Sequence, residues 1–335
     1  MIEIEAKTAM IQSPEEIRAM TSELTMSVWT LAAIGALFEA GIVEHLREPR
    51  SIDELEKLCP AIARSRVQRS LELAAVSGFV VADETRHRLA PGAMPFAESP
   101  MRGALAGDIR TTLMQALALL DASRDAQPSR GWQHTNPALL QSQGDASSAL
   151  AVMLKRAIVP SLEGLAERLE QPGARFLDVG SGVASLAIAM CRLFPALEVT
   201  GLDVSDAALN IARSNVKAAR LESRIELRQL AVEDLSEERA YNLAWHPSFF
   251  IPSAEAACAR IHAALRPGGF ILFAFSGQGP ERRTNAVWTL IDELWGGIAP
   301  SALEVQAFLE RASFAAVRAI PGPTWAPSLM VGRRD

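Results

Sequence analysis

Apolar positions in the first part of the chain recur at the spacing of an amphipathic helix. From Pro14 to about Arg47 an apolar residue returns every three or four positions, which predicts one or two helices with a buried face. Ser51 is followed three positions later by Glu54, the pattern of a capping box. We therefore expect a short helix to begin after Ser51 and to end before Pro60.

A third helix and a hairpin follow. The helix is predicted at about 63–77, with Gly78 as its C-terminal signal, and the next residues alternate and turn like a small hairpin. Three helices and a hairpin in this order are typical of a winged helix, which DNA-binding domains share. Arg64, Arg66 and Arg69 on the third helix keep a DNA-binding interpretation open, but the acidic composition favours the alternative that they form a solvated face.

Helix-breaking residues bound a helical middle section. A linker rich in proline at 91–100 precedes a helical pattern at 101–122. A second breaker-rich patch at 125–137 separates this pattern from a long predicted helix that ends near Leu169. The sequence therefore predicts three domains or regions: 1–100 like a winged helix, 101–173 helical, and a third from 174 to 335.

From Ala174 onward, short apolar runs alternate with helical stretches. Five strands are predicted, at 175–180, 197–204, 225–232, 241–246 and 268–275. The helices expected between and after them lie at 185–193, 206–219, 254–265 and 300–312, and two closing strands at 314–320 and 326–335. This alternation predicts the α/β class, with a parallel, doubly wound sheet.

Composition narrows the classes of function. The 39 acidic and 33 basic residues give a net charge of −6, which argues against a general affinity for nucleic acid or for an anionic membrane. The three cysteines form no close pair or cluster with histidine, so we expect neither disulfide nor zinc site. The charged amino terminus excludes an ordinary secretory signal, and the uncharged segment at 25–38 is too short to span a membrane. A soluble cytoplasmic protein is expected.

The segment Phe176 to Ser185 joins the first predicted strand to a helix through a glycine-rich turn. Gly180 and Gly182 allow the backbone to approach a ligand, and the helix start supplies unpaired N–H groups. A tight turn with no ligand would need the same glycines, so the pattern alone leaves both interpretations open.

Two carboxylates make a nucleotide-like ligand the better interpretation. Asp203 ends the next predicted strand at the spacing where an acid accepts both ribose hydroxyls. Asp178 precedes the first glycine, where its charge disfavours a pyrophosphate and suits an ammonium group. Ser185 also stands where a dinucleotide motif has its third glycine, which disfavours a nicotinamide-dependent oxidoreductase. An adenosine cofactor with an ammonium group and no phosphate is S-adenosylmethionine.

The chain from Ala174 to its end resembles the class I S-adenosylmethionine-dependent methyltransferases. The segment LDVGSGVA is similar to their first motif, GLDVS to their ribose-binding acid, and LRPGGFILF to their fifth-strand signature. The preceding regions resemble the amino-terminal part of bacterial small-molecule O-methyltransferases, in which a winged helix builds the dimer and the substrate pocket. The resemblance implies a Rossmann-like methyltransferase sheet, a homodimer, a role in secondary metabolism and a small-molecule substrate.

The resemblance also implies which residues hold the cofactor. Asp178 is expected to orient the methionine amino group, the glycine turn to line the ligand, and Asp203 to hold the ribose. The family commonly has an acid near the adenine amine, but Ala231 stands there in this chain, so backbone groups and apolar contacts are expected instead. The full set of expected cofactor contacts is Asp178, Gly180, Ser181, Gly182, Asp203, Val204, Ala231, Val232 and Trp245.

The sequence offers fewer motifs for the residues that would contact the methyl acceptor. Related O-methyltransferases have a catalytic histidine in the first turn after the fourth strand, and the matching position here is Ile251. His246 at the end of that strand is the substitute candidate for a general base, and a strand-end histidine bonded to backbone is the alternative. The HPSF segment also bears a loose resemblance to the acceptor-gripping loop of amino-methyltransferases.

The expected acceptor contacts combine aromatic, histidine and methionine side chains. Trp132 and His134 interrupt two helices and either wall a pocket or pack the helices together. Met153, Phe249 and Phe250 complete the set. The absence of an aspartate cluster after the fourth strand leads us to expect no magnesium.

The function predicted is methyl transfer from S-adenosylmethionine to a small, aromatic or apolar metabolite, with O-methylation favoured. N-methylation of a small molecule is the first alternative. A non-catalytic winged-helix regulator that senses S-adenosylmethionine is the second.

Overall fold

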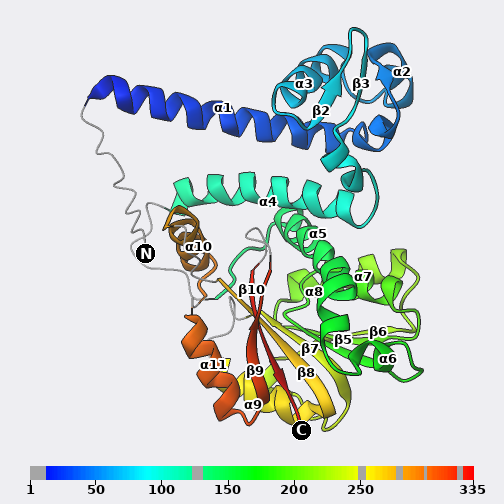
Figure 1. The fold of residues 1–335 in the computed structure, drawn as a ribbon, viewed down its shortest axis with the longest axis vertical. Coiled ribbons are helices and arrows are strands. Elements are labelled where there is room, and N and C mark those ends of the chain that lie inside the picture. The colour runs from blue at the N-terminus through cyan, green and yellow to red at the C-terminus, as the bar shows by residue number, and fades with distance from the viewer. Residues whose placement is uncertain (1–12, 123–130, 248–253, 277–281, 298–299, 323–326) are drawn as a thin grey trace. The chain divides into compact units, whose positions relative to one another are not determined.

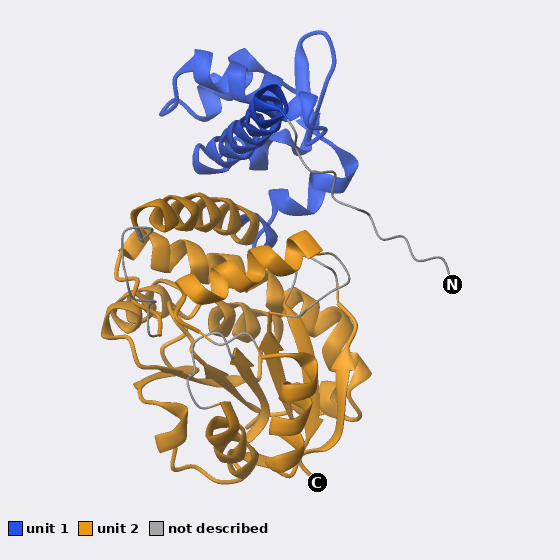
Figure 2. Ribbon diagram, turned by 90° about the vertical axis from the view of Figure 1, so that its left-hand side faces the viewer, with its two compact units in different colours: residues 1–102 blue, residues 103–335 orange. Residues whose placement is uncertain are grey.

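A computed structural model describes residues 13–122, 131–247, 254–276, 282–297, 300–322 and 327–335. The chain divides into two compact units, residues 1–102 and 103–335 (Figure 2). Each unit has its own elements and core.

The amino-terminal unit contains three α-helices and a small sheet, in the order that the apolar pattern predicts. The helices are α1 (Pro14–Glu39), α2 (Ile52–Leu58) and α3 (Arg64–Val76), and the strands are β1 (Arg50–Ser51), β2 (Val80–Ala82) and β3 (Arg86–Leu89). The sheet has the order β1-β3-β2, and all its pairs are antiparallel. Capping boxes begin both α1 and α2, as the Ser51–Glu54 pattern predicts for the second.

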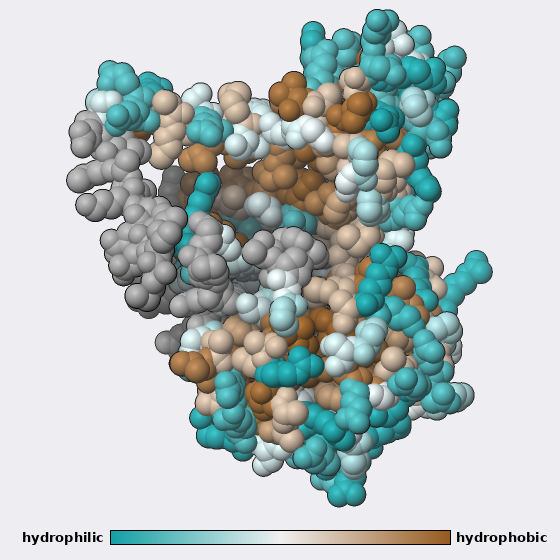
Figure 3. Space-filling model, viewed as in Figure 1, coloured by the Kyte–Doolittle hydropathy of each residue, from teal (hydrophilic) through white to brown (hydrophobic). Residues whose placement is uncertain are grey.

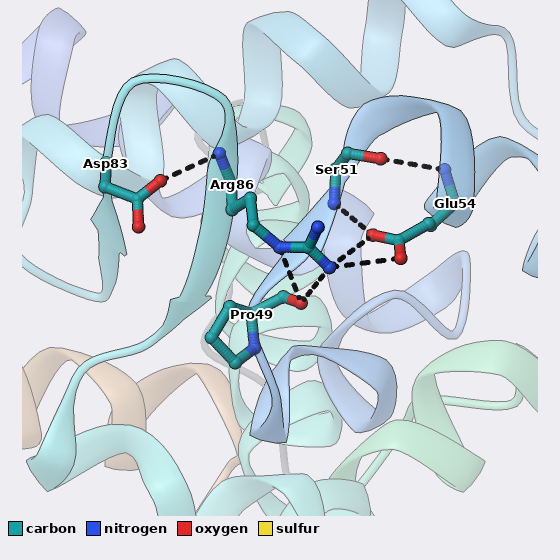
Figure 4. Close-up of polar contacts among 5 residues, drawn as sticks. All are labelled: Pro49, Ser51, Glu54, Asp83 and Arg86. Atoms are coloured by element: carbon teal, nitrogen blue, oxygen red, sulfur yellow. Dashed lines mark hydrogen bonds and ion pairs between the residues drawn. The ribbon is translucent and has the colours of Figure 1, made fainter.

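A single arginine ties the hairpin of this unit to α2. The Arg86 guanidinium donates to both carboxylate oxygens of Glu54, at 2.9 and 3.0 Å, and to the carbonyl oxygen of Pro49 at 2.9 Å (Figure 4). Glu54 also accepts from the backbone N–H of Ser51 within the capping box. One carboxylate therefore closes the start of α2 and fixes the position of β3.

Helix α1 packs only at its end. Leu37 and Phe38 are its buried residues, and an earlier stripe of apolar side chains is exposed: Ile17, Met20, Leu24, Met26, Val28 and Trp29, at 40 to 65%. Tan and brown residues lie among paler ones along this helix in Figure 3. Among the described residues, α1 is the one helix long and apolar enough to cross a membrane by length and composition, criteria that other kinds of helix also meet.

The carboxyl-terminal unit begins with a pair of closely packed helices, α4 (Met101–Ala122) and α5 (Pro137–Met153). A Cβ atom at Gly107 of α4 would lie 2.5 Å from the carbonyl oxygen of Ser142 and 2.8 Å from the amide nitrogen of Ala146, both on α5. Because real Cβ contacts are never so short, glycine at this position allows the two backbones to meet.

The prediction of one long helix ending near Leu169 is wrong. Helix α5 ends at Met153 and continues as a π-turn at Leu154–Ile158 and a 3₁₀ turn at Val159–Ser161 before α6 (Leu165–Leu169). Pro160 removes a backbone donor, and Gly164 takes a left-handed φ of +64°, so a continuous helix cannot form here.

A seven-stranded sheet in the order β6-β5-β4-β7-β8-β10-β9 is the centre of this unit (Figure 1). Its strands are β4 (Arg175–Val179), β5 (Glu198–Asp203), β6 (Ile225–Gln229), β7 (Tyr241–Pro247), β8 (Leu265–Phe275), β9 (Ala315–Ile320) and β10 (Ser328–Arg333). The first five strands are parallel, and β10 is antiparallel to both β8 and β9. The sheet is thus mixed, because the closing pair reverses direction at one edge.

Helices cover both faces of the sheet. They are α7 (Ser185–Leu193), α8 (Asp206–Ala218), α9 (Ala254–Ala264) and α11 (Ala302–Arg311), and a further helix, α10 (Arg282–Leu294), follows β8 in the chain. Alternate residues of β4 enter different cores: Phe176 packs with α5 to α8, and Leu177 packs with α9 and α11. Strands buried on both faces read as the near-continuous apolar runs seen in the sequence. The pattern did not reveal α10, whose Val287 and Leu290 are exposed.

Candidate cofactor and acceptor site

The turn between β4 and α7 has alternate residues in the left-handed region. The φ angles are +66° at Gly180, +54° at Gly182 and +65° at Ala184. Glycine adopts this conformation without steric cost, whereas alanine adopts it with strain. A Cβ atom at Gly182 would meet no atom within 4 Å, so the turn leaves open space beside its backbone.

Ser181 attaches this turn to the neighbouring strand. Its backbone N–H donates to the carbonyl oxygen of Leu202 at 2.9 Å. Its side chain lies so close to β5 that a Cβ atom at Gly201 would stand 2.8 Å from the Ser181 hydroxyl oxygen. This hydroxyl is buried and has no hydrogen-bond partner among the described residues. It is therefore a polar group available to a ligand.

Asp203, the last residue of β5, is held by backbone donors on both sides. Oδ2 accepts from the N–H of Gly182 at 2.8 Å, and Oδ1 accepts from the N–H of Ser205 at 2.8 Å. Burial raises the pKa of this carboxyl, and the backbone hydrogen bonds oppose that rise. Each carboxylate oxygen keeps further acceptor capacity. The carboxylate can thus accept two more hydrogen bonds from one ligand.

Asp178 lies near the end of the adjacent strand, and its hydrogen bonding differs from that of Asp203. Its side chain is 1% exposed, and Oδ2 has no hydrogen-bond partner in the described structure. Burial, with a smaller contribution from the charge of Asp203, raises the pKa of Asp178 to about 8. A ligand cation beside it would favour the ionised form, so this carboxyl suits an ammonium group.

The other predicted cofactor contacts lie toward the carboxyl ends of β5 and of the parallel strands β6 and β7. Trp245 is directly opposite Asp178 in the β4–β7 register and is buried, whereas Val204 after β5 is 69% exposed. Val232 is buried in the core with Leu202, which leaves mainly backbone groups of this segment for a ligand. Ala231 is half-buried and follows Leu230, whose N–H donates to the Asp203 carbonyl oxygen at 3.1 Å.

His246 is fully buried in β7, beside the end of the strand. Its ring contacts Phe273 of β8 edge to face, with 4.7 Å between centroids. Neither ring nitrogen has a hydrogen-bond partner among the described residues, so the backbone-bonded alternative has no support there. Burial lowers the pKa of His246 to about 3, which keeps the imidazole neutral near pH 7. Its role as a base stays a prediction.

The structure brings Trp132 and His134 together near the glycine turn. Their rings lie 4.7 Å apart, and Trp132 also contacts Trp295 beyond α10 at 6.0 Å. Trp132 packs against a small core that includes Val183, the residue after Gly182. Met153 is half-buried against the core of α5 to α8. Phe249 and Phe250, like Ile251, lie outside the described residues.

Comparison with known proteins identifies this site's family. The span from residue 176 to 269, which contains the glycine turn and both aspartates, matches the sequence model of a family described as "Methyltransferase domain". The chain contains a methyltransferase domain. The chain is 37% identical over 122 residues to a ubiquinone biosynthesis O-methyltransferase from Alkalilimnicola ehrlichii, covering 34% of this chain and 47% of that protein.

A second relative is a release factor glutamine methyltransferase from Cereibacter sphaeroides. It is 30% identical over 171 residues, which cover 48% of this chain and 60% of that protein. The chain thus spans about half the length of the curated relatives it matches.

Solved structures confirm the predicted fold over nearly the whole chain. Human N-acetylserotonin methyltransferase in complex with S-adenosylmethionine matches with a TM-score of 0.67 and 16% identity, covering 97% of this chain and 99% of that chain. The mitomycin 7-O-methyltransferase matches with a TM-score of 0.59 and 20% identity, covering 95% and 98%. The Rossmann-like sheet with an amino-terminal helical region is therefore confirmed, and so is the resemblance to these methyltransferases.

The carboxyl-terminal unit also contains a buried acid that the sequence gave no reason to single out. Asp292 of α10 is 2% exposed, and its Oδ1 accepts from the Ser276 hydroxyl at 2.7 Å. Its position was missed because α10 itself was not predicted. Within the described residues, no group of three or more histidine, cysteine or acidic side chains is placed to hold a metal ion.

The state of Asp178 gives a prediction for the protein without ligand. Because its folded pKa is about 8 and its usual pKa is near 3.8, the stability that this group contributes is complete below pH 4 and is lost as the pH rises toward 8. Asp178→Asn should therefore raise the free energy of unfolding at pH 7 on the order of 2 kcal/mol. Urea denaturation at pH 4, 7 and 8.5 measures this.

The exposed Glu198→Gln, at the other end of β5, is the matched control and should change stability by less than about 0.5 kcal/mol. A destabilised Asp178→Asn protein at pH 7, or a gain that does not shrink toward pH 4, would contradict the buried, unpaired state of this acid.

Proposed function

We propose that this protein transfers a methyl group from S-adenosylmethionine to a small molecule, with oxygen as the favoured acceptor atom. The observation that carries this proposal is the pairing of two unlike carboxyl groups beside the glycine turn. Asp203 is held by backbone donors and Asp178 lacks a partner for Oδ2. One suits a ribose diol and the other suits an ammonium group.

The residues present fit this cofactor in three respects. Asp178 offers an unpartnered buried oxygen, Ser181 offers an unpartnered hydroxyl, and the open space beside Gly182 admits a ligand. A pyrophosphate would oppose the ionisation of Asp178, whereas an ammonium group favours it, and this argues against a nicotinamide cofactor. When bound, S-adenosylmethionine supplies a methyl group on a sulfonium that is already activated for displacement.

The chain's own contribution is mainly to bind, orient and exclude water. Asp178 and Asp203 fix the two polar ends of the cofactor, while Val204, Ala231, Val232 and Trp245 surround the remainder. Gly180 and Gly182 keep the turn open to it. Alignment of the two reactants in a dry site accounts for much of the acceleration that a displacement reaction needs.

His246 is the proposed general base for an acceptor that must lose a proton. Its neutral imidazole has free ring nitrogens within the described residues and is therefore in the form that accepts a proton. Trp132, His134, Met153, Phe249 and Phe250 are proposed to contact the acceptor. The ring contacts at Trp132 support an aromatic or apolar acceptor of the kind found in secondary metabolism.

N-methylation of a small molecule is the second candidate. It is favoured by the likeness to a release factor glutamine methyltransferase, which covers more of this chain than the likeness to the O-methyltransferase from Alkalilimnicola ehrlichii. The His246-Pro247 pair would then begin the loop that holds the acceptor nitrogen. Identification of the methylated atom by mass spectrometry and NMR separates the two.

Ion pairs in the amino-terminal unit weaken the case for a DNA-binding regulator. Arg64 forms ion pairs with Asp53 and Glu56, and Arg69 pairs with Glu72. Acids of the same unit therefore offset two of the three arginines on α3, so a positive surface for DNA is not favoured.

We also propose that the protein is a cytoplasmic homodimer. The exposed apolar stripe of α1 supports this, because such a surface on a soluble protein marks an interaction site and a second copy supplies a matching one. The net charge of −6 argues against attraction to an anionic membrane.

The cofactor proposal is tested at Asp203. Asp203→Asn keeps the shape of the side chain but removes the charge that strengthens hydrogen bonds to the ribose. The dissociation constant for S-adenosylhomocysteine should rise at least about tenfold by calorimetry, while Glu198→Gln leaves it unchanged. If Asp203→Asn bound S-adenosylhomocysteine with unaltered affinity, the cofactor assignment would be refuted.

The base proposal is tested at His246. His246→Ala should lower kcat by about 100-fold or more while leaving affinity for S-adenosylhomocysteine unchanged. Because burial lowers the pKa of His246 to about 3, the acid side of the wild-type rate profile should fall below pH 5 rather than near 6.5.

His262→Ala is the control for packing, since His262 contacts Phe314 edge to face in the same way as His246 contacts Phe273. An equal loss of turnover in both variants would show that His246 acts through packing.

The dimer is tested on α1. Leu24→Glu places a charge in the middle of the exposed stripe and should convert a dimer into monomers, as measured by light scattering. Val76→Glu, at an exposed position on α3, should leave the dimer intact. A monomeric wild-type protein, or a dimeric Leu24→Glu variant, would refute this interface.

A further inference from the structure

Helix α10 turns polar and aromatic residues inward. Trp288, Asp292 and Trp295 follow one another at helical spacing, so they lie on one side. Asp292 is 2% exposed and Trp295 is 6% exposed, whereas Val287 and Leu290 on the other side are about half exposed. This arrangement is the reverse of an ordinary amphipathic helix. Packing alone does not explain a buried acid on its inner side.

Asp292 has no charge partner among the residues that the structure describes. Its Oδ1 accepts from the Ser276 hydroxyl at 2.7 Å, and its Oδ2 has no hydrogen-bond partner in the described part of the chain. Burial raises the pKa of Asp292 to about 6, and the Ser276 hydrogen bond opposes that rise. Near pH 7.5 the group is therefore mostly ionised, and a buried carboxylate without a counter-charge is costly.

The location of Asp292 is the edge of the sheet where His246 lies. Ser276 comes directly after Phe275, the last residue of β8, and His246 of β7 is paired with Phe273 of β8. Asp292 thus approaches the carboxyl end of β8 through Ser276. It stands on the acceptor side, apart from the cofactor residues of β4 and β5.

Three indole rings lie close to one another around Trp295, which follows Asp292 on the same side of the helix. Trp295 donates from Nε1 to the Gln115 side-chain oxygen at 2.9 Å, which fixes its ring against α4. The ring of Trp288 lies 6.5 Å from that of Trp295, and the ring of Trp132 lies 6.0 Å from it. Faces of indole rings attract cations. A carboxylate and several indoles together form a setting for an organic cation.

We propose that Asp292 determines which acceptor is used, by binding a protonated amine on an aromatic methyl acceptor. The inference rests on the proposed function and deepens it, since the amine is remote from the atom that receives the methyl group. The amine supplies the counter-charge that Asp292 lacks, and the indoles pack on the aromatic body. His246 does not supply that charge, because its burial keeps it neutral.

The test uses matched cationic and neutral probes. Tyramine, dopamine and serotonin are each compared with their N-acetylated forms, by calorimetry on the full chain saturated with S-adenosylhomocysteine at pH 7.5. In at least one pair the amine should bind at least about tenfold more tightly than the acetylated form. Asp292→Asn should reduce that ratio to near one without altering the affinity for S-adenosylhomocysteine.

Two controls separate charge from folding. Glu293→Gln, an exposed neighbour on α10, should keep the wild-type preference. Ser276→Ala leaves the charge of Asp292 in place and should retain a preference above that of Asp292→Asn. Thermal unfolding of each variant verifies that the fold is intact.

The proposal is overturned if no amine binds more tightly than its acetylated form, or if Asp292→Asn keeps the preference. If the acetylated form bound more tightly in every pair, Asp292 would accept a hydrogen bond from a neutral donor instead of binding a cation. Failure of wild-type protein to bind S-adenosylhomocysteine is a separate result, which refutes the proposed cofactor.

Discussion

The burial of two acidic groups side by side at the end of the parallel strands is the constraint on which this site depends. Asp203 tolerates burial because Gly182 and Ser205 donate to it, and this requires the turn after β4 to bend toward β5. Asp178 receives no comparable help at Oδ2, and the charge of Asp203 opposes its ionisation. The glycine turn and the close contact of Ser181 at Gly201 hold the loop after β4 against β5, and this brings the two acids together.

Neighbouring side chains of β7 point to opposite faces of the sheet, and two of them have different proposed roles. Trp245 enters the core formed with α5 to α8, whereas His246 packs on Phe273 in the core formed with α9 and α11. Adjacent side chains of a strand point to opposite faces. The proposed cofactor contact and the proposed base therefore have different surroundings, and a substitution at one leaves the packing of the other largely intact.

The sequence was sufficient to predict the helices and strands that have a regular pattern of apolar residues. The strands of the sheet are apolar runs between breakers, and the helix from Ser185 to Leu193 was predicted with the ends it has. Prediction from the sequence failed where such a pattern is absent or interrupted. The π-turn after α5 depends on a single proline and glycine within an otherwise helical pattern, and α10 carries its buried acid among exposed aliphatic residues.

The same contrast holds within the candidate site. Glycine spacing and the strand-end aspartates were enough to predict a cofactor edge, because these residues lie within short segments and the turn requires glycine at positive φ. The proposed acceptor side could not be assigned in this way, since Ser276, Gln115 and the α10 segment with Asp292 and Trp295 are far apart in the sequence and meet only after folding. No short segment contains them together.

The hydrogen bond from Trp295 to Gln115 has a consequence for how such a protein diversifies. It attaches the end of α10 to α4, while the proposed cofactor edge is formed by β4, β5 and the turn after β4. Residues on the inner side of α10 can thus change over evolutionary time without altering the groups proposed to hold the methyl donor. The proposed donor site can in this way be inherited unchanged while the acceptor molecules are replaced.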